Sequence, residues 1–397
     1  MRAHRDFVHV SHFAASRGNA GAMPTAPGHG PLSPSRFGAS RAWVPGAKSL
    51  SPHTRGILRQ VPTFQRPARG SEIMDGSDFP ILRLLADGKF HSGKELGRII
   101  GLSRARVCNC ISRIESLGVR VFKVRGRGYR LAESLDLLEG EKLPVLLKEA
   151  CASLAIEVMD ECPSTNTELA GRAARGAAHG AVLACEHQSA GRGRRGNSWL
   201  SAVGGSVAFS LLWRFSRGAG ALSGLSLAVA VAVARALEGL GIAGVQVKWP
   251  NDLYCRDRKL GGILIEISGD NLGPSAAVVG VGLNVRLDAR LHDRIAQPVT
   301  DLAHCCNAPP SRTVLIVALL KSLAGVLEKF GREGFAPFRE EWLRRHAWQG
   351  RRVALSLADR RVAEGEVVGV AEDGALVLAS TQGIERFHSG ELTLRPS

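Results

Sequence analysis

Strand-like and helix-like runs alternate through the middle of the chain, and this alternation limits the possible fold more than any other feature. Apolar runs typical of buried strands occupy residues 181–185, 206–213, 245–248, 262–267 and 277–281. Runs with helical periodicity lie between and after them, at 166–174, 225–240 and 311–333. We therefore predict a mixed α/β or α+β domain at residues 150–345.

The segment before this domain, residues 77–140, has the plan of a winged helix-turn-helix. A short apolar helix is followed by a capping-box pattern at Ser92 and Glu95, a second helix, and a third helix beginning after Ser103. Two strands joined by a basic, glycine-containing turn complete the unit. We predict that the third helix enters the DNA major groove and that the hairpin contacts phosphates. The candidate DNA-binding residues are Ser103, Arg104, Arg106, Arg113, Arg125 and Arg127. A winged helix that serves only protein contacts is the alternative.

The two ends of the chain differ from these domains. Residues 349–397 contain short strand-like runs separated by turns, which is typical of a small β-barrel. Residues 1–73 contain ten Lys or Arg, two Asp or Glu and no sustained periodicity, so we expect a disordered basic extension. Met74 is the expected translation start, and a transit peptide is the alternative for this extension. Since this extension carries half of the net charge of +16, the charge is weak evidence for nucleic-acid binding.

Cysteine spacing and hydropathy indicate the cellular compartment of the protein. The eight cysteines form no C-x-x-C pair, so we expect reduced thiols in a cytoplasmic protein rather than a metal site. The sequence contains no stretch close to the roughly 18 uninterrupted apolar residues of a transmembrane helix, and we expect no membrane partner.

A run of arginines and glycines, GRGRRGNSW at residues 191–199, directly follows the strand-like run 181–185. Guanidinium groups match carboxylates and phosphates, and glycines allow a backbone to approach a ligand. The run predicts a loop that is mobile when empty and closes over an anionic substrate, with a solvated basic linker as the alternative. It is not a dinucleotide-binding fingerprint, because no helix and no suitably spaced acidic residue follow it.

Four further clusters also lie at the ends of apolar runs: PSTN at 163–166, KWPND at 248–252, KLGG at 259–262 and GVGLNV at 280–285. Each alone is explained as a helix cap, a turn or a bulge. Together with the arginine-rich run they place cations, an aspartate and asparagines at strand ends, and no Ser-His-Asp set or glycosidase-like carboxylate pair stands out. This combination favours the activation of a carboxylic acid by a nucleotide, which depends on positioning and charge neutralisation.

The motifs GRGRRGNSW, KWPNDLY, KLGGILIE and GVGLNV, in this order, resemble those of the biotin protein ligases. The winged helix ahead of them resembles that of the bifunctional biotin operon repressor/ligases, and the resemblance covers about residues 78–397. It implies an α+β protein with an N-terminal winged helix-turn-helix. A central mixed α/β domain of the class II synthetase-like biotin/lipoate ligase type and a C-terminal SH3-like β-barrel follow.

The resemblance also implies a two-step reaction and a regulatory role. Biotin and Mg²⁺·ATP would give biotinyl-5′-AMP, and the biotin would then pass to a lysine of the biotin carboxyl carrier protein of acetyl-CoA carboxylase. With biotinyl-5′-AMP as corepressor, a homodimer would bind operator DNA and repress the biotin operon.

Individual site residues follow from the same motifs. The resemblance implies that biotin is bound by Ser164, Thr165, Asn166, Gln188, Arg192, Gly193, Arg194 and Lys259. It implies that the nucleotide is bound by Trp199, Asn251, Asp252 and Asn284, with Asp252 also holding Mg²⁺. The catalytic residues would be Arg192, Arg194, Lys248 and Lys259. Residues 297–302 resemble a second ligand-ordered loop, which lies over adenine.

Three alternatives stay open at this point. A lipoate ligase shares the catalytic fold, a transcription factor that only senses biotin would lack catalysis, and a ligase could have a winged helix that no longer regulates. The third helix reads RVCNC at 106–110, an unusual composition for a groove-facing surface.

Overall fold

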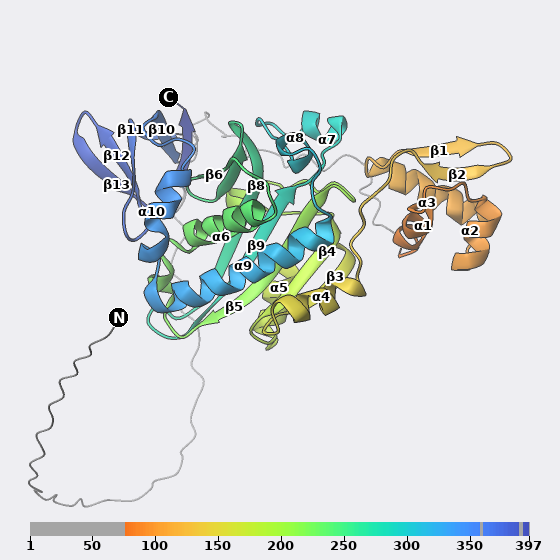
Figure 1. Ribbon diagram of the computed structural model, residues 1–397, viewed down its shortest axis with the longest axis horizontal. Helices are drawn as coiled ribbons and strands as arrows, with labels where there is room; N and C mark the ends of the chain where they lie inside the picture. Colours follow the sequence, from red (N-terminus) through yellow and green to blue (C-terminus); the bar gives the residue numbers. More distant parts are fainter. Residues whose placement is uncertain (1–75, 358–359, 389–391, 397) are drawn as a thin grey trace, which may run out of the picture. The chain divides into compact units, whose positions relative to one another are not determined.

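The computed structural model describes residues 76–357, 360–388 and 392–396. The predicted extension 1–73, the expected start at Met74 and residues 389–391 of the predicted barrel lie outside these residues. Figure 1 shows a helical unit, a large mixed sheet covered by helices, and a small antiparallel sheet. This arrangement confirms the predicted α+β class and the predicted order of the three parts.

Three helices and a hairpin form the first unit. They are α1 (Asp78–Leu85), α2 (Gly93–Ile100), α3 (Arg104–Ser116), β1 (Val121–Val124) and β2 (Gly128–Leu131). The hydroxyl of Ser92 accepts a hydrogen bond from the amide of Glu95, and that of Ser103 accepts one from Arg106. These caps begin α2 and α3 where the sequence predicted them. Gly101 ends α2 with a φ of 76°, a left-handed conformation that favours glycine.

The central sheet has seven strands in the order β3-β4-β5-β9-β8-β7-β6. The strands are β3 (Ala155–Cys162), β4 (Ala181–Gln188), β5 (Ser206–Phe215), β6 (Val245–Lys248), β7 (Asp252–Cys255), β8 (Arg258–Gly269) and β9 (Ser275–Asn284). β3 and β4 are parallel, and the other neighbours pair antiparallel. The polar clusters of the sequence therefore follow or begin strands of one sheet.

Helices cover both faces of this sheet. The helices of this part of the chain are α4 (Lys142–Ala150), α5 (Thr165–Ala174), α6 (Leu225–Gly239), α7 (Ala289–Arg294), α8 (Leu302–Cys305), α9 (Arg312–Glu333) and α10 (Ala336–Arg345), with short 3-10 turns at Arg194–Gly196 and Ala219–Leu222. Leu211 of β5 belongs to the main core with α6 and α9, whereas the next residue, Leu212, packs with Leu169 of α5. Because successive strand residues point to opposite faces, α5 lies on the face opposite to α6 and α9. Figure 1 shows α6 and α9 side by side across the sheet.

The last described strands form a five-stranded antiparallel sheet in the order β13-β12-β11-β10-β14. Their bounds are β10 (Arg352–Leu357), β11 (Arg360–Val370), β12 (Leu376–Ser380), β13 (Gly383–Phe387) and β14 (Leu392–Pro396). The indole of Trp249 donates a hydrogen bond to the carbonyl of Gly374, so the β11–β12 turn is fixed against the central domain. Among the helices that the structure describes, none combines the length and apolar character needed to span a bilayer.

Candidate functional site

One cavity of about 1100 Å³ gathers the candidate ligand-binding residues at the ends of the central strands. Every residue predicted to bind biotin or nucleotide, and every predicted catalytic residue, contributes to its wall. They are Ser164, Thr165, Asn166, Gln188, Arg192, Gly193, Arg194, Trp199, Lys248, Asn251, Asp252, Lys259 and Asn284. The strand order explains this convergence, since β4, β9, β8 and β6 carry the separate motifs to one region of the sheet.

A closed hydrogen-bond network forms one end of the cavity, where β3 leads into α5. The side chain of Ser164, the residue before α5, does not cap the helix. Instead the Oε1 atom of Gln188 accepts hydrogen bonds from the amide of Thr165 at 2.8 Å and from its hydroxyl at 3.2 Å. The hydroxyl of Ser210, buried on β5, donates to Oδ1 of Asn166 at 2.6 Å and lies 2.8 Å from the hydroxyl oxygen of Thr165. The alternative explanation of this cluster, in which the hydroxyl of Ser164 caps the helix, is therefore wrong.

The side-chain amide of Asn166 is bonded on both sides. Its Oδ1 accepts from Ser210, and its Nδ2 donates to the carbonyl of Leu264 at 3.2 Å and to Glu266 at 3.0 Å. A Cβ atom at Gly280 would lie 2.1 Å from Oδ1 of Asn166. Glycine at this position of the GVGLNV motif is thus required by close packing.

The arginine-rich loop forms a small closed hairpin over the cavity. Arg192 pairs with Ser198 as an isolated bridge, and the amide of Trp199 donates to the carbonyl of Gly191 at 2.8 Å. Arg195 has a left-handed φ of 61°, which turns the chain at the tip. The loop therefore lines the cavity rather than forming a solvated linker, and its mobility when empty stays a prediction.

The two predicted loop arginines are both engaged by the protein. Arg192 donates to the hydroxyl of Thr167 at 2.8 Å and forms a 2.7 Å ion pair with Glu266 of β8. Arg194 donates to the side chain of Asn251 at 3.2 Å. Burial lowers the pKa of the Arg194 guanidinium, and the nearby Asp252 carboxylate opposes that shift. Desolvated guanidinium groups interact strongly with an anion that enters.

Lys259 joins the start of β8 to the second predicted loop. Its ammonium forms a 2.8 Å ion pair with Asp252. Its backbone amide donates to the carbonyl of Pro298, and its carbonyl accepts from the amide of Thr300. Residues 297–299 consequently line the cavity as an added edge beside Lys259.

Lys248 and Asn284 occupy strand ends in the same cavity. The ammonium of Lys248 donates to the hydroxyl of Tyr254 at 3.1 Å. Asn284 is buried and donates to the carbonyl of Thr300 at 3.0 Å. Trp199 packs where a Cβ at Gly282 would lie, 2.7 Å from the indole.

Several residues of this site escaped the sequence analysis. Glu266, Ser210 and Trp348 contact candidate residues but belong to none of the assigned positions. Ser210 interrupts an otherwise apolar strand, and that interruption was an available signal. Trp348 lies far along the chain from Lys248 and carries no local motif.

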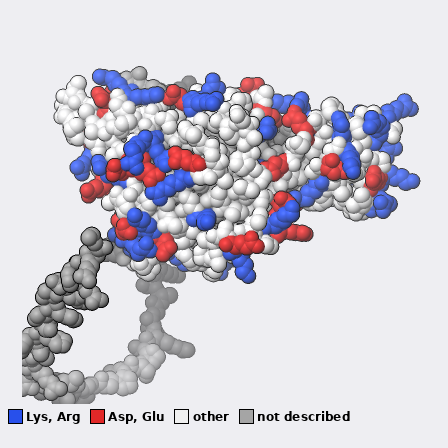
Figure 2. All heavy atoms as spheres, in the orientation of Figure 1, with Lys and Arg blue, Asp and Glu red and all other residues white. Residues whose placement is uncertain are grey.

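The predicted DNA interface uses exposed arginines of the helical unit. Arg104 and Arg106 are exposed at the start of α3, and Arg125 and Arg127 are exposed on the hairpin turn. The guanidinium of Arg127 lies 4.3 Å from the ring centroid of Phe90. Figure 2 shows basic and acidic side chains intermingled over the face in view. That face therefore carries mixed charges and not one uniform basic field.

Arg113 and Ser103 have other roles in this unit. Arg113 makes a bidentate ion pair with Asp78, which is fully buried, at 2.8 and 2.7 Å. This side chain therefore joins α3 to α1, and its contact with DNA stays a prediction. The hydroxyl of Ser103 caps α3 through the amide of Arg106.

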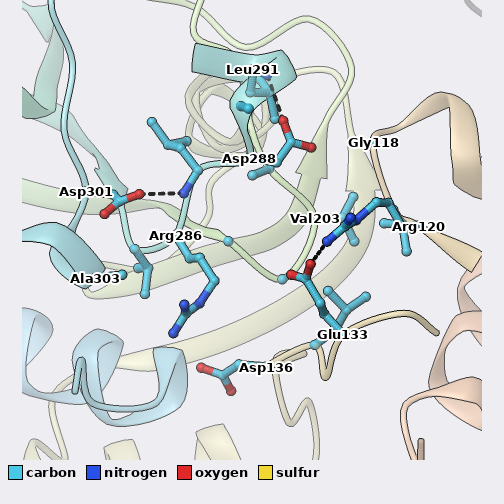
Figure 3. Close-up of a pocket in the computed structure, with 18 of the residues that line it drawn as sticks. Gly118, Arg120, Glu133, Asp136, Val203, Arg286, Asp288, Leu291, Asp301 and Ala303 are labelled. Carbon is cyan, nitrogen blue, oxygen red and sulfur yellow. Dashed lines mark hydrogen bonds and ion pairs between the residues drawn. The ribbon is translucent and has the colours of Figure 1, made fainter. Parts of the chain in front are cut away.

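A second cavity, of about 1090 Å³, lies between residues 117–120 and 133–136 on one side and residues 285–291 on the other. Figure 3 shows Arg120 paired with Glu133 and Asp288 capping α7 at Leu291. The carboxylate of Asp301 accepts from the amide of Leu287. The residues predicted to bind ligand do not contribute to the described wall of this cavity. Its position beside the helical unit separates it from the first cavity.

Three segments of the chain match known protein families. Residues 159–284 match the biotin/lipoate A/B protein ligase family, residues 79–130 match a helix-turn-helix domain, and residues 350–395 match the biotin protein ligase C-terminal domain. These matches follow the order of the three structural parts.

Full-length relatives and a solved structure agree with these matches. The chain is 36% identical over 315 residues to the bifunctional ligase/repressor BirA of Salmonella typhimurium and 35% identical to that of Escherichia coli. Each alignment covers 79% of this chain and 96% of the relative. The biotin protein ligase of Aquifex aeolicus in complex with biotin and ATP matches with a TM-score of 0.53 and 29% identity, covering 61% of this chain and 99% of that chain.

Proposed function

The chain belongs to the family of bifunctional biotin ligase/repressors, and from this membership we propose how its residues perform the two activities. The carboxylate of biotin attacks the α-phosphorus of ATP, pyrophosphate leaves, and biotinyl-5′-AMP stays in the cavity. The amine of a lysine on the biotin carboxyl carrier protein of acetyl-CoA carboxylase then attacks the anhydride carbonyl, and AMP leaves. The observation that carries this proposal is the convergence of all candidate ligand residues on one cavity.

The network between α5 and β4 supports a division of roles at the biotin end. The amide of Asn166 is bonded by Ser210, Leu264 and Glu266, so Asn166 shapes the pocket wall. Gln188 uses its carbonyl oxygen to hold Thr165, so that its amide nitrogen is the group directed to a ligand. We assign Ser164, Thr165 and Gln188 to the polar head of biotin, which has both donors and acceptors.

Four cations supply the charge that the reaction requires. Arg192, Arg194, Lys248 and Lys259 all line the cavity. Arg192 pairs with Glu266, and Lys259 pairs with Asp252. An anionic ligand would take the place of these carboxylates, and the cations would then stabilise the negative charge that develops at the phosphate. Closure of the loop around Gly193 would exclude water from the anhydride.

The nucleotide end has a donor set that fits Mg²⁺. Magnesium prefers oxygen ligands and is commonly held by one or two carboxylates together with substrate phosphates. Asp252 places one carboxylate in the cavity, and the described residues contain no cluster of three or more His, Cys, Asp or Glu that would form an all-protein cage. We assign Asp252 to the metal and Asn251, Trp199 and Asn284 to the nucleotide. When bound, Mg²⁺ neutralises the charge of the leaving pyrophosphate.

The repressor activity requires a second surface. We propose that the adenylate-bound protein forms a homodimer through β8, because β7 pairs with β8 only as far as Gly262 while β8 extends to Gly269. Among the described strands none covers this outer edge, and an open edge offers backbone groups to a second copy. Arg104, Arg106, Arg125 and Arg127 then contact operator DNA. We place the protein in the cytoplasm, where its eight cysteines stay free thiols.

The experiment that tests the ligase activity is biotin-dependent release of pyrophosphate from Mg²⁺·ATP by the full chain, with lipoate in parallel. We expect release with biotin and none with lipoate. Release with lipoate alone would assign the chain to lipoate chemistry, and no release with either would contradict the proposed reaction. Transfer of biotin to the carrier protein tests the second step.

A further inference from the structure

The ammonium group of Lys248 lies against two aromatic rings, and one of them comes from a distant part of the chain. Lys248 Nζ is 4.0 Å from the ring centroid of Trp348 and 5.1 Å from that of Tyr254. Tyr254 belongs to the KWPNDLY motif, whereas Trp348 lies between α10 and β10. A cation within about 6 Å of an aromatic face is attracted by the ring. Both rings therefore act on the position of this ammonium.

Backbone contacts at the edge of the central sheet bring Trp348 to this place. Val247 of β6 forms a parallel bridge with His346, and the carbonyl of Val247 accepts a 2.9 Å hydrogen bond from the amide of Ala347. Trp348 is only 6% exposed, and its ring meets that of Tyr254 edge to face at 6.3 Å. The segment that enters the C-terminal sheet is thus attached beside Lys248 and contributes to the wall of the same cavity.

The neighbouring histidine adds no positive charge beside the ammonium of Lys248. His346, next to this contact, is buried, and burial together with the charge of Lys248 lowers its pKa to about 4. Its imidazole is therefore neutral near pH 7. The hydroxyl oxygen of Tyr254 accepts a 3.1 Å hydrogen bond from the ammonium of Lys248. The facing carboxylates are Asp252 and Asp257, which line the same cavity.

We propose that Trp348 is a positioning residue for the adenylation step and holds the ammonium of Lys248 where negative charge develops on the α-phosphate. A lysine side chain is long and flexible, and a ring on one side restricts the positions it samples before the reaction. Groups fixed in advance stabilise a transition state more than groups that must reorganise. Trp348 lies outside the matched segments 159–284 and 350–395, so those family matches do not include this residue.

This inference rests on the proposed function, because it assigns a partner to a residue of the proposed reaction. The first test compares Trp348→Leu and Trp348→Phe in the full chain by the rate of pyrophosphate release at saturating biotin and varied ATP. We expect Trp348→Leu to lower kcat by about 5- to 30-fold, with a smaller change in KM for ATP, and Trp348→Phe to retain most of the rate. Trp213→Leu is the control, since Trp213 is equally buried on β5 and lies outside the cavity wall.

A double-mutant cycle separates positioning from general packing. A non-hydrolysable biotinyl-adenylate analogue is titrated against the parent, Trp348→Leu, Lys248→Met and the double variant. We expect Trp348→Leu to weaken binding in the parent background and to have little effect beside Lys248→Met. The stoichiometry of biotin binding counts the folded fraction, and Trp348→Met, which also lacks an aromatic ring, replaces the leucine variant in the cycle if the latter does not fold.

Two results would overturn the inference while leaving the proposed function intact. One is an unchanged kcat in Trp348→Leu, and the other is an equal loss of analogue binding in both backgrounds. A parent chain that neither releases pyrophosphate nor binds the analogue would instead contradict the proposed function itself.

Discussion

Gln188 performs a task that helix capping usually gives to a serine or threonine. Its Oε1 atom accepts from the first amide of α5, at Thr165, so that the hydroxyl of Ser164 is not used as a cap. Capping side chains normally come from the residue directly before the helix. Here the cap comes from the end of β4. A conformational change in the loop that follows Gln188 would therefore alter the start of α5.

Arg194 is the residue whose loss should affect retention of the intermediate most directly. It is half-buried and donates to Asn251, which places its guanidinium between the loop and the nucleotide end. We expect Arg194→Gly to raise the release rate of biotinyl-5′-AMP by about 10- to 100-fold, because a hydrogen bond to a charged group contributes roughly 1.5–3 kcal/mol. Stopped-flow fluorescence of the dissociating adenylate measures this rate.

Arg195→Gly is the matched control for that variant. Arg195 is exposed and has a left-handed φ of 61°, which glycine adopts without strain. Its release rate should stay near that of the parent. Equal retention of the adenylate by Arg194→Gly and the parent would contradict the closing role of the loop.

His346 should make stability depend on pH. Burial lowers its pKa to about 4 from an ordinary 6.5, so between these values the unfolded chain binds a proton that the folded chain does not. Unfolding free energy then falls as pH falls from about 6.5 to 4, by up to about 1.4 kcal/mol per pH unit. Urea unfolding at several pH values should show that the unfolding free energy of His346→Phe depends less steeply on pH than that of the parent. This variant keeps a ring against Trp342. The exposed His388→Phe is the control, and identical slopes for parent and His346→Phe would refute the assignment.

The sequence predicted the site wherever a residue stood inside a short motif. Lys248 and Lys259 are examples at strand ends, and Arg192 is an example in the glycine-rich loop after β4. Glu266 was missed, since one acidic residue in the apolar run ILIE gives no hint that it will pair with an arginine of another loop. Such partners depend on strand order, which local sequence does not encode.

Helices and strands also differ in how clearly the sequence predicts them. β6 and α9 were predicted within one residue of their bounds, because each has a long or uniform hydrophobic pattern. The sequence predicted no helix at α4, Lys142–Ala150, which is short and contains Pro144. Packing of Leu143 and Leu147 into the main core stabilises this helix, and that contact is not visible in the sequence.

The uncovered edge of β8 should determine whether two copies associate. Ile267 is 44% exposed on this edge. We expect Ile267→Lys to weaken the adenylate-dependent dimer by about 10- to 100-fold, because edge lysines oppose strand pairing and like charges would face each other across the two-fold axis. Sedimentation equilibrium with saturating biotinyl-5′-AMP measures the effect.

Val362→Lys provides the comparison for this edge variant. Val362 is 45% exposed and lies on β11 of the C-terminal sheet, so it carries the same change at a surface of similar exposure. Its dimer affinity should equal that of the parent. Loss of dimer in both variants, or in neither, would exclude β8 as the contact.

At the scale of the whole molecule, one buried ion pair joins the connection after the winged helix to the catalytic core. Arg312 and Glu186 are both fully buried and lie 2.6 Å apart. Arg312 also donates to the carboxylate and the carbonyl of Asp136, while Glu186 accepts from the amides of Leu138 and Gly204. A buried ion pair with further hydrogen bonds on both members holds its partners in one geometry. Residues 136–138 are therefore fixed to β4 at Glu186, which lies two residues before Gln188.

Val203 links the arginine-rich loop to the helical unit by a second contact. It follows Trp199 by a few residues and is buried among the apolar side chains of that unit, with Leu135 packed beside it. Movement of the loop on ligand binding would thus reach the winged helix through residues 200–203. Through these contacts, binding of the adenylate would alter DNA binding by the winged helix.

Operator binding is the prediction that tests this coupling in the intact protein. We expect tighter binding of the DNA upstream of the biotin genes in the presence of biotinyl-5′-AMP than in its absence, measured by fluorescence anisotropy at several salt concentrations. Arg125→Ala removes one exposed guanidinium from the hairpin, so it should lower affinity and reduce the slope of log K against log salt by about 1. Arg344→Ala, an exposed arginine of α10 paired with Glu340, should change neither quantity. Affinity that is independent of the adenylate would show a ligase whose winged helix no longer regulates, because the contacts at Val203 and Asp136 would then transmit nothing to the DNA.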